Sequence, residues 1–272
     1  MRPVKFAGMI AAAALLLSGF GATSSAQTTP ATQTPAKPKS TTTAKPAAAA
    51  TYDRALLRPA LLKDKAPESF QVKFETTKGD FTVTLTRAWA PLAVDRFYNL
   101  VKHHYFDNAR FFRVVPNFVV QFGISAYPPV TAAWQKATIK DEPVNQKNVR
   151  GTLTFAKTSE PNSRTTEIFI NLKDNPSLDS QGFAPFGAVD STGMSVVDTF
   201  YGQYGDSAGL DQEPMEKQGE KYIAQKWPLL DAIKHASLVG AAVTKPAAKT
   251  AAKPATTKPA AGSAAKPAAQ PQ

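Results

Sequence analysis

The sequence predicts a mainly β domain, an antiparallel barrel or sandwich whose openings are covered by helices. Many short segments alternate apolar and polar residues, as half-buried strands do, and only a few segments have helical spacing. Strands and helices do not alternate regularly along the chain, which argues against a parallel sheet. The chain contains no cysteine, so we expect its apolar core to stabilise it, without disulfides or thiolate metal sites.

The first half of the domain is predicted as a hairpin, a helix and two further strands. Residues 70–86, FQVKFETTKGDFTVTLT, alternate on both sides of a KGD turn, as a β-hairpin does. The period then becomes helical over residues 90–103, with a proline where the first turn of a helix tolerates one. Residues 110–124, RFFRVVPNFVVQFGI, predict two strands separated by a Pro-Asn pair.

The second half is predicted to contain more strands and then helices. Residues 125–150 are polar and are expected to form a long irregular excursion. Two strands are expected at 150–158 and 166–172, and a short one at FAPFGAVD. Residues 193–205, GMSVVDTFYGQYG, have helical spacing. Residues 211–240 are expected to form a C-terminal helical extension interrupted by a proline.

The two ends of the chain differ from the middle in composition. Residues 1–26 have a basic start, an apolar run shorter than a spanning helix needs, and small residues at the end. This pattern predicts a secretory signal peptide and an exported protein, periplasmic or secreted; an uncleaved anchor is the alternative. Residues 27–50 and 241–272 are mainly Ala, Pro, Thr and Lys, which predicts a disordered linker and a disordered basic tail.

The net charge of +11 belongs mostly to these ends. Residues 1–50 and 241–272 hold 10 of the 32 basic residues and none of the 21 acidic ones, which leaves 22 basic and 21 acidic residues in between. Basic tails attract anionic envelope polymers without specificity, although the tails are also interpretable as soluble spacers. We expect no specific nucleic-acid partner and a monomer.

Several common catalytic signatures are absent. The sequence has no P-loop and no nucleophile elbow, and its three histidines lack metal-ligand spacing, so no cofactor and no metal is expected. His103 and His104 stand at a predicted helix end, where we expect them to interact with the last carbonyls. Arg113 is unusual because an unpaired charge on an apolar strand is costly to bury. By itself it is either a core arginine paired with Asp107 or Glu167, or part of a site.

Three blocks of the sequence resemble the cyclophilin family. They are FFRVVPNFVVQFG, GTLTFAKTSEPNSRTTEIFI and LDSQGFAPFGAVDSTGMSVVDTF, in the family's order and spacing, and the resemblance covers residues 70–204. It implies a closed eight-stranded antiparallel barrel capped by two helices, which we place at residues 51–210. It also implies cis–trans isomerisation of X–Pro peptide bonds without a cofactor.

The resemblance implies a set of site residues. Arg113 takes the position of the family's catalytic arginine, and Gln121 that of a glutamine that binds substrate and orients the arginine. Phe118, Val119 and Phe169 match positions that hold the proline ring. The complete set of implied substrate-binding residues is Phe118, Val119, Gln121, Ala156, Lys157, Glu167, Phe169, Leu178 and Phe183.

Some of these positions depart from the better-known members. The strand edge Ala156–Lys157 matches a place where backbone groups pair with the substrate, but Lys157 replaces an asparagine. Glu167 replaces a glutamine, which favours basic over acidic substrates. Ser177 stands where many members have tryptophan, and Phe183 is nearest to a missing rim histidine. We expect these changes to leave weak or no cyclosporin binding and to affect catalysis less.

The sequence therefore predicts an exported peptidyl-prolyl isomerase that acts on proline-containing segments of unfolded or extended proteins and assists their folding. Two alternatives remain open. One is a cyclophilin-like module that binds proline peptides and hardly turns them over. The other is an envelope interaction protein that uses its basic tails.

Overall fold

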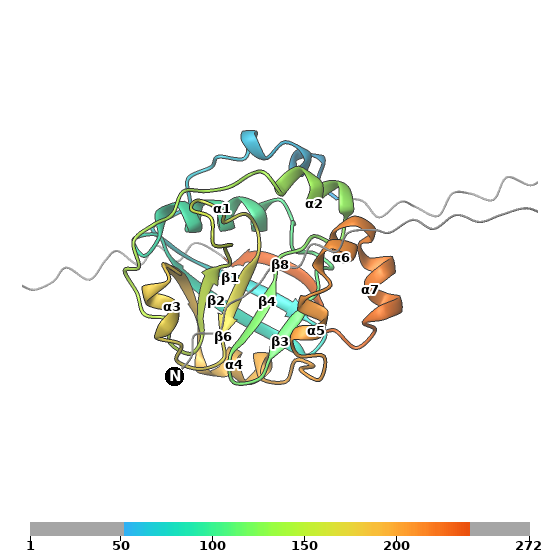
Figure 1. The fold of residues 1–272 in the computed structure, drawn as a ribbon. Helices are drawn as coiled ribbons and strands as arrows, with labels where there is room; N and C mark the ends of the chain where they lie inside the picture. Colours follow the sequence, from blue (N-terminus) through green and yellow to red (C-terminus); the bar gives the residue numbers. More distant parts are fainter. Residues whose placement is uncertain (1–51, 240–272) are drawn as a thin grey trace, which may run out of the picture. The chain divides into compact units, whose positions relative to one another are not determined.

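The computed structural model describes residues 52–239, which are built around one eight-stranded sheet (Figure 1). The predicted signal peptide, linker and basic tail, at residues 1–26, 27–50 and 241–272, lie outside the described residues. Within residues 52–239, no helix has the length and apolar character needed to cross a lipid bilayer.

All neighbouring strands of the sheet are antiparallel, and their order is β3-β4-β6-β5-β7-β2-β1-β8. The strands are β1 (Ser69–Thr76), β2 (Gly79–Thr86), β3 (Arg113–Val115), β4 (Val119–Phe122), β5 (Thr152–Phe155), β6 (Ile168–Asn171), β7 (Pro185–Val189) and β8 (Ile233–Val239). The mainly β class and the hairpin at residues 70–86 are confirmed. So are the two strands predicted on either side of the Pro-Asn pair.

Two helices cover the openings of the curled sheet. Figure 1 shows α1 at one end and α4 at the other. The helix predicted at residues 90–103 is confirmed as α1. The helical elements are η1 (Arg54–Leu57), η2 (Pro59–Leu61), α1 (Pro91–Lys102), α2 (Pro128–Trp134), α3 (Ser177–Ser180), α4 (Ser191–Val197), α5 (Asp206–Gly209), α6 (Gln212–Gln218) and α7 (Glu220–Lys226).

The sheet curls into a half-barrel but does not close, which corrects the expectation of a closed barrel. Its edge strands β3 and β8 share no ladder. Just outside them, Arg110 and Ala232 form an isolated bridge. The physical reason lies at the free edge of β3, where Val114 pairs with Gly205 at the entrance to α5. The segment that follows α4 therefore occupies the edge that β8 would need.

The main core fills the inside of the curl. Phe70, Val72 and Phe74 are buried along β1, while the residues between them are more exposed, as the two-residue period of a strand requires. Phe74 stacks on Phe81 of β2 with 4.9 Å between ring centroids. Further phenylalanines pack around this pair edge-on or tilted, an arrangement that aromatic rings favour.

Residues 125–150 are more ordered than their polar composition predicts. Helix α2 lies in this segment, and its Trp134 is buried against the main core. The indole N–H of Trp134 donates to the carbonyl of Leu56 at 2.8 Å. One buried tryptophan thus orders a short helix whose periodicity was too brief to detect in the sequence.

The same excursion also caps α1. The residue before this helix, Ala90, has no side chain able to accept a hydrogen bond from the first turn. The carboxylate of Glu142 takes that role and accepts from the N–H groups of Leu92 at 2.6 Å and Ala93 at 3.0 Å. A negative group at a helix N-terminus is favourable because the first N–H groups lack partners within the helix.

The segment 211–240 is helical only in its first half. Helices α6 and α7 end before Pro228, and the chain then forms β8 rather than the expected helix. Ile233 and Ala236 of β8 are buried, and the strand pairs with β1. The helices form a second apolar cluster with Phe112 and Ile124, which lie just outside β3 and β4.

We predict that the core depends on the C-terminal strand. Replacing the fully buried Ile233 with alanine removes three carbons from the core. We expect this to lower the free energy of unfolding by about 2–5 kcal/mol. Leu238 on the same strand is 38% exposed, and its replacement with alanine is expected to cost less than about 1 kcal/mol. Urea unfolding of both variants measures the difference. Equal losses would contradict the buried position of Ile233.

Candidate active site

The register of three strands places a charged, a polar and an aromatic residue in one row. Arg113 of β3 is paired with Gln121 of β4, and Gln121 is paired with Phe169 of β6. Neighbouring residues such as Val120 and Ile170 belong to the main core, so the row lies on the opposite face of the sheet. Side chains paired across strands in this way lie close enough to interact.

An apolar cluster separate from the main core lies on this face. Val119, Phe169 and Leu178 are its buried members. The partly buried residues packed against them are Phe118, Ala156 and Phe183. The rings of Phe169 and Phe183 meet edge to face with 5.6 Å between centroids. Six of the nine predicted substrate-binding residues therefore form one cluster.

The guanidinium of Arg113 is held from two sides. Its Nε donates to Oδ1 of Asp206 at 2.6 Å, and its Nη1 donates to Oε1 of Gln121 at 3.2 Å. The charged group lies 5.6 Å from the ring centroid of Phe118, within the range of a cation–π contact. A side chain in place of the hydrogen of Gly209 would meet Cδ of Arg113 at 2.6 Å, so this glycine lets α5 pack on the arginine.

These contacts argue against the interpretation of Arg113 as a core arginine paired with Asp107 or Glu167. Its side chain is 24% exposed and does not enter the main core. The two acids considered as core partners bond elsewhere: Asp107 pairs with His235, and Glu167 accepts from Gln121. The observed partner, Asp206, lies 93 positions along the chain, and no local spacing indicated it.

Glu167 extends the row of hydrogen bonds and has an unusual pKa. Its Oε2 accepts from Nε2 of Gln121 at 2.7 Å. Burial raises the pKa of the Glu167 carboxyl to about 7; the hydrogen bond from Gln121 opposes this shift, and the negative charge of Glu216 adds to it. In its ionised form the Glu167 carboxylate only accepts hydrogen bonds, so this form fixes the Gln121 amide with its oxygen toward Arg113.

The rim beside the apolar cluster carries Lys157. Its ammonium lies 5.4 Å from the ring centroid of Phe183. The N–H of Ala156 donates to the carbonyl of Glu167 at 2.9 Å and is thus occupied. Within the described residues, the N–H and C=O of Lys157 make no backbone hydrogen bond. A depression of about 340 Å³ adjoins this rim, and its lining includes Gln121, Ala156, Lys157, Glu167 and Glu216.

Two buried asparagines position the loops around the apolar cluster, and the sequence analysis missed both. Nδ2 of Asn175 donates to the carbonyl of Phe118 at 3.1 Å, and Nδ2 of Asn148 donates to the carbonyl of Phe183 at 2.8 Å. The N–H of Asn148 also donates to Asp179 at 2.9 Å. Asparagine is common in turns, so its presence in polar segments gave no signal of a buried role.

Comparison with known proteins places this arrangement in context. A family model described as cyclophilin type peptidyl-prolyl cis-trans isomerase/CLD matches residues 71–219. A peptidyl-prolyl cis-trans isomerase of Acinetobacter baylyi is 35% identical over 172 residues, which is 60% of this chain and 88% of the relative. Peptidyl-prolyl cis-trans isomerase B of Escherichia coli is 34% identical over 150 residues, 52% of this chain and 90% of the relative.

A solved structure is also similar. The crystal structure of a cyclophilin type peptidyl-prolyl cis-trans isomerase from Cryptosporidium parvum aligns with a TM-score of 0.47 at 19% sequence identity. The alignment covers 63% of this chain and 98% of the other.

The raised pKa of Glu167 predicts a pH-dependent stability. The folded-state pKa of about 7 lies above the ordinary value of 4.5, so the folded state binds the proton more tightly than the unfolded state. The free energy of unfolding therefore falls as the pH rises from 4.5 to 7. Glu167→Gln should remove this component, so its stability relative to the original chain should increase over that interval.

Urea unfolding at several pH values measures the stability difference, and carbon-13 NMR of the Glu167 carboxyl measures the midpoint directly. If the Glu167 carboxyl titrated with a midpoint near pH 4.5, and the stability difference between the original chain and Glu167→Gln stayed constant with pH, burial would not perturb the pKa of this group.

Proposed function

Because this chain belongs to the cyclophilin-type peptidyl-prolyl cis-trans isomerase family and is a peptidyl-prolyl isomerase, we propose that it turns X–Pro bonds at the row of Arg113, Gln121 and Phe169. The observation that carries this proposal is the apolar cluster of Val119, Phe169 and Leu178, which lies apart from the main core. Arg113 contacts the same cluster through Phe118. An apolar receptor beside a cation suits a proline ring and its peptide nitrogen.

The reaction needs binding rather than bond cleavage. The barrier of about 18–20 kcal/mol arises from the partial double bond of the amide. In the twisted state the prolyl nitrogen becomes pyramidal and regains its lone pair. A guanidinium directed at that nitrogen stabilises the twisted amide more than either planar form, which is what acceleration requires. Within residues 52–239, Nη2 of Arg113 makes no hydrogen bond and is available for this contact.

The other site residues hold the substrate around that contact. Phe118, Val119 and Phe169 receive the proline ring, whose burial needs no polar partner. Leu178 and Phe183 form the rim. The peptide before the proline pairs with backbone groups at the Ala156–Lys157 edge.

At that edge we assign the pairing to Lys157 rather than to Ala156. The N–H of Ala156 is used inside the sheet, whereas the backbone of Lys157 is not. Its long side chain, held over Phe183, narrows the rim and supports weak or absent cyclosporin binding. The acids Glu167 and Glu216 favour basic residues near the proline.

We further propose that the enzyme is exported and assists the folding of unfolded or extended proteins in the periplasm or outside the cell. Support comes from the basic start, apolar run and small residues of the segment 1–26. The basic segments 27–50 and 241–272 would hold the enzyme near anionic polymers. The proposed export is tested by the mass of the protein recovered from outside the cytoplasm, since cleavage after Ala26 gives a chain that begins at Gln27.

One observation favours the alternative of a binding module with little turnover. The carboxylate of Asp206 pairs with Arg113 and offsets part of the charge that the twisted amide would use. The side chain of Asp206 is 58% exposed, however, and ion pairs in contact with water are weak. We therefore assign Asp206 to positioning Arg113.

Removal of the guanidinium tests the proposed site. We predict that Arg113→Ala lowers kcat/KM for an X–Pro peptide at least about tenfold, because the twisted amide loses its cation. Arg150→Ala is the matched control, since Arg150 is also ion-paired but with Asp198, and its replacement should leave kcat/KM unchanged. A protease-coupled isomerisation assay gives both values. A folded Arg113→Ala protein with undiminished kcat/KM would exclude Arg113 from catalysis.

The role of Asp206 is tested by separating kcat from KM. We predict that Asp206→Ala lowers kcat by about threefold to tenfold and changes KM less than about twofold, since the guanidinium loses orientation but the apolar cluster is untouched. Glu213→Ala, which removes another exposed acid in an ion pair, should change neither value. An increase in kcat on removing Asp206 would show that its carboxylate competes with the substrate for Arg113.

A further inference from the structure

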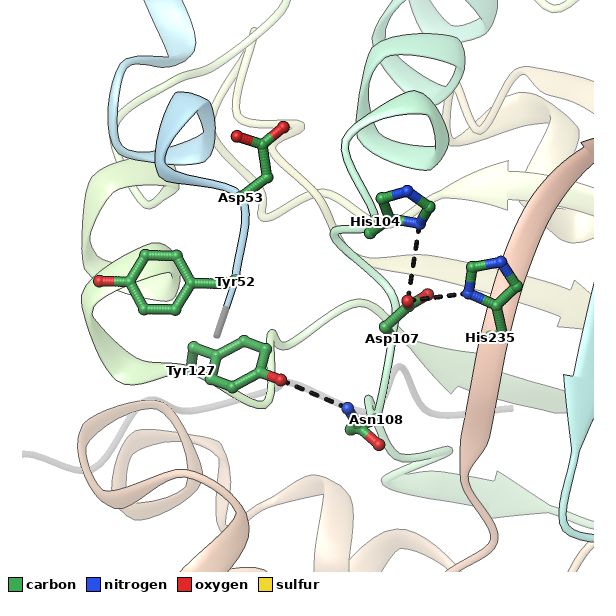
Figure 2. A pocket seen from close by; sticks show the side chains of 7 residues that line it. All are labelled: Tyr52, Asp53, His104, Asp107, Asn108, Tyr127 and His235. Atoms are coloured by element: carbon green, nitrogen blue, oxygen red, sulfur yellow. Dashed lines mark hydrogen bonds and ion pairs between the residues drawn. The ribbon is translucent and has the colours of Figure 1, made fainter. Parts of the chain in front are cut away.

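The fold brings together histidines that are far apart in the sequence. The chain has three histidines and no cysteine. His104 follows helix α1, His235 lies on β8, and both rings face the carboxylate of Asp107 (Figure 2). Spacing along the chain gave no metal-ligand signal, because strand β8 brings the second imidazole to the site from the other end of the domain.

The three side chains form a compact donor set. Nδ1 of His235 lies 2.8 Å from Oδ2 of Asp107, and Nδ1 of His104 lies 3.6 Å from the same oxygen. One ligand atom from each residue lies within 4.8 Å of the others. Around a tetrahedral zinc ion, ligand atoms at about 2.0–2.1 Å from the metal are roughly 3.4 Å apart. The distances of 2.8 Å and 3.6 Å from Asp107 to the two imidazole nitrogens lie on either side of this value, and the two rings, stacked with 5.2 Å between centroids, would rotate to direct both nitrogens at one ion.

The carboxylate of Asp107 is already oriented for this role. Its Oδ1 accepts a hydrogen bond from the backbone N–H of Ala236 at 3.1 Å, which leaves Oδ2 toward the two imidazoles. Hydrogen bonds of this kind orient the ligands of metal sites. His104 has a positive φ of 59°, a conformation that costs free energy in most residues other than glycine.

We propose that His104, Asp107 and His235 bind one zinc ion and that water completes its coordination. Two imidazoles and a carboxylate suit this borderline metal, for which three protein ligands and a water are a known arrangement. A depression of about 280 Å³ lies at the cluster, and 55% of the His104 side chain is exposed, so water reaches the site. The third histidine, His103, is not part of the set because its Nδ1 lies 2.6 Å from Asp53.

Zinc at this position would connect the turn after α1 to strand β8. Within the described residues, β8 has a ladder with β1 and with no other strand. The ligands come together only in the folded chain, so zinc binding favours the folded state over the unfolded one. The proposed ion would stabilise the folded chain, and its site is separate from the isomerase site.

Zinc titration of the full exported chain tests the proposal. After treatment with a chelator and its removal, isothermal titration calorimetry with zinc chloride at pH 7.5 should show one zinc ion per chain. We expect His104→Asn, Asp107→Asn and His235→Asn each to weaken binding at least about tenfold. Asparagine at position 104 retains the left-handed backbone conformation easily. His103→Asn is the matched control and should bind zinc as the original chain does.

Thermal unfolding provides an independent measurement. Zinc should raise the Tm of the original chain and of His103→Asn, and it should leave the Tm of His235→Asn unchanged. Similar Tm values without zinc would show that the variants fold; if His235→Asn does not fold, His104→Asn serves in its place. The proposal would be overturned if the original chain did not bind zinc, or if His104→Asn and His235→Asn bound zinc as tightly as the original chain. Either result would leave a simple hydrogen-bonded cluster.

Discussion

The site depends on how the guanidinium of Arg113 is held on the face of the sheet turned away from the main core. Strand pairing brings Gln121 beside it, and helix α5 brings Asp206 to the other side. Gly209 allows that helix to approach the arginine closely. Without these contacts a long, charged side chain would sample many rotamers, and fixing it during the reaction would cost entropy. The geometry thus holds the guanidinium in one orientation.

The segment after α4 contributes to this site as well as to the fold. It occupies the free edge of β3 at Gly205, supplies Asp206, and continues into α6 and α7, which pack on Phe112 and Ile124. The chain then returns as β8 to the opposite edge of the sheet. The same excursion that keeps the half-barrel open therefore also holds the side chain of Arg113.

Local patterns were sufficient to predict part of this structure. The hairpin of β1 and β2 and the helix α1 each have a clear period and a turn residue or a proline at the boundary. The apolar residues of the candidate site were singled out only through the family resemblance, because Phe118 and Phe169 by themselves fit a core better than a pocket. Asp206, Asn148 and strand β8 were missed since their partners lie far along the chain, and nothing local indicates such pairings.

The central claim is that Arg113 acts on the twisted amide, while Phe169 and its neighbours bind the proline ring. Exchange NMR of an X–Pro peptide with substoichiometric enzyme measures binding, from line shifts, and turnover, from the cis–trans exchange rate, in one experiment. The account predicts that Arg113→Lys keeps the line shifts and loses most of the accelerated exchange, whereas Phe169→Ala loses both. Accelerated exchange that persists in Arg113→Lys, or line shifts that disappear with it, would contradict the account.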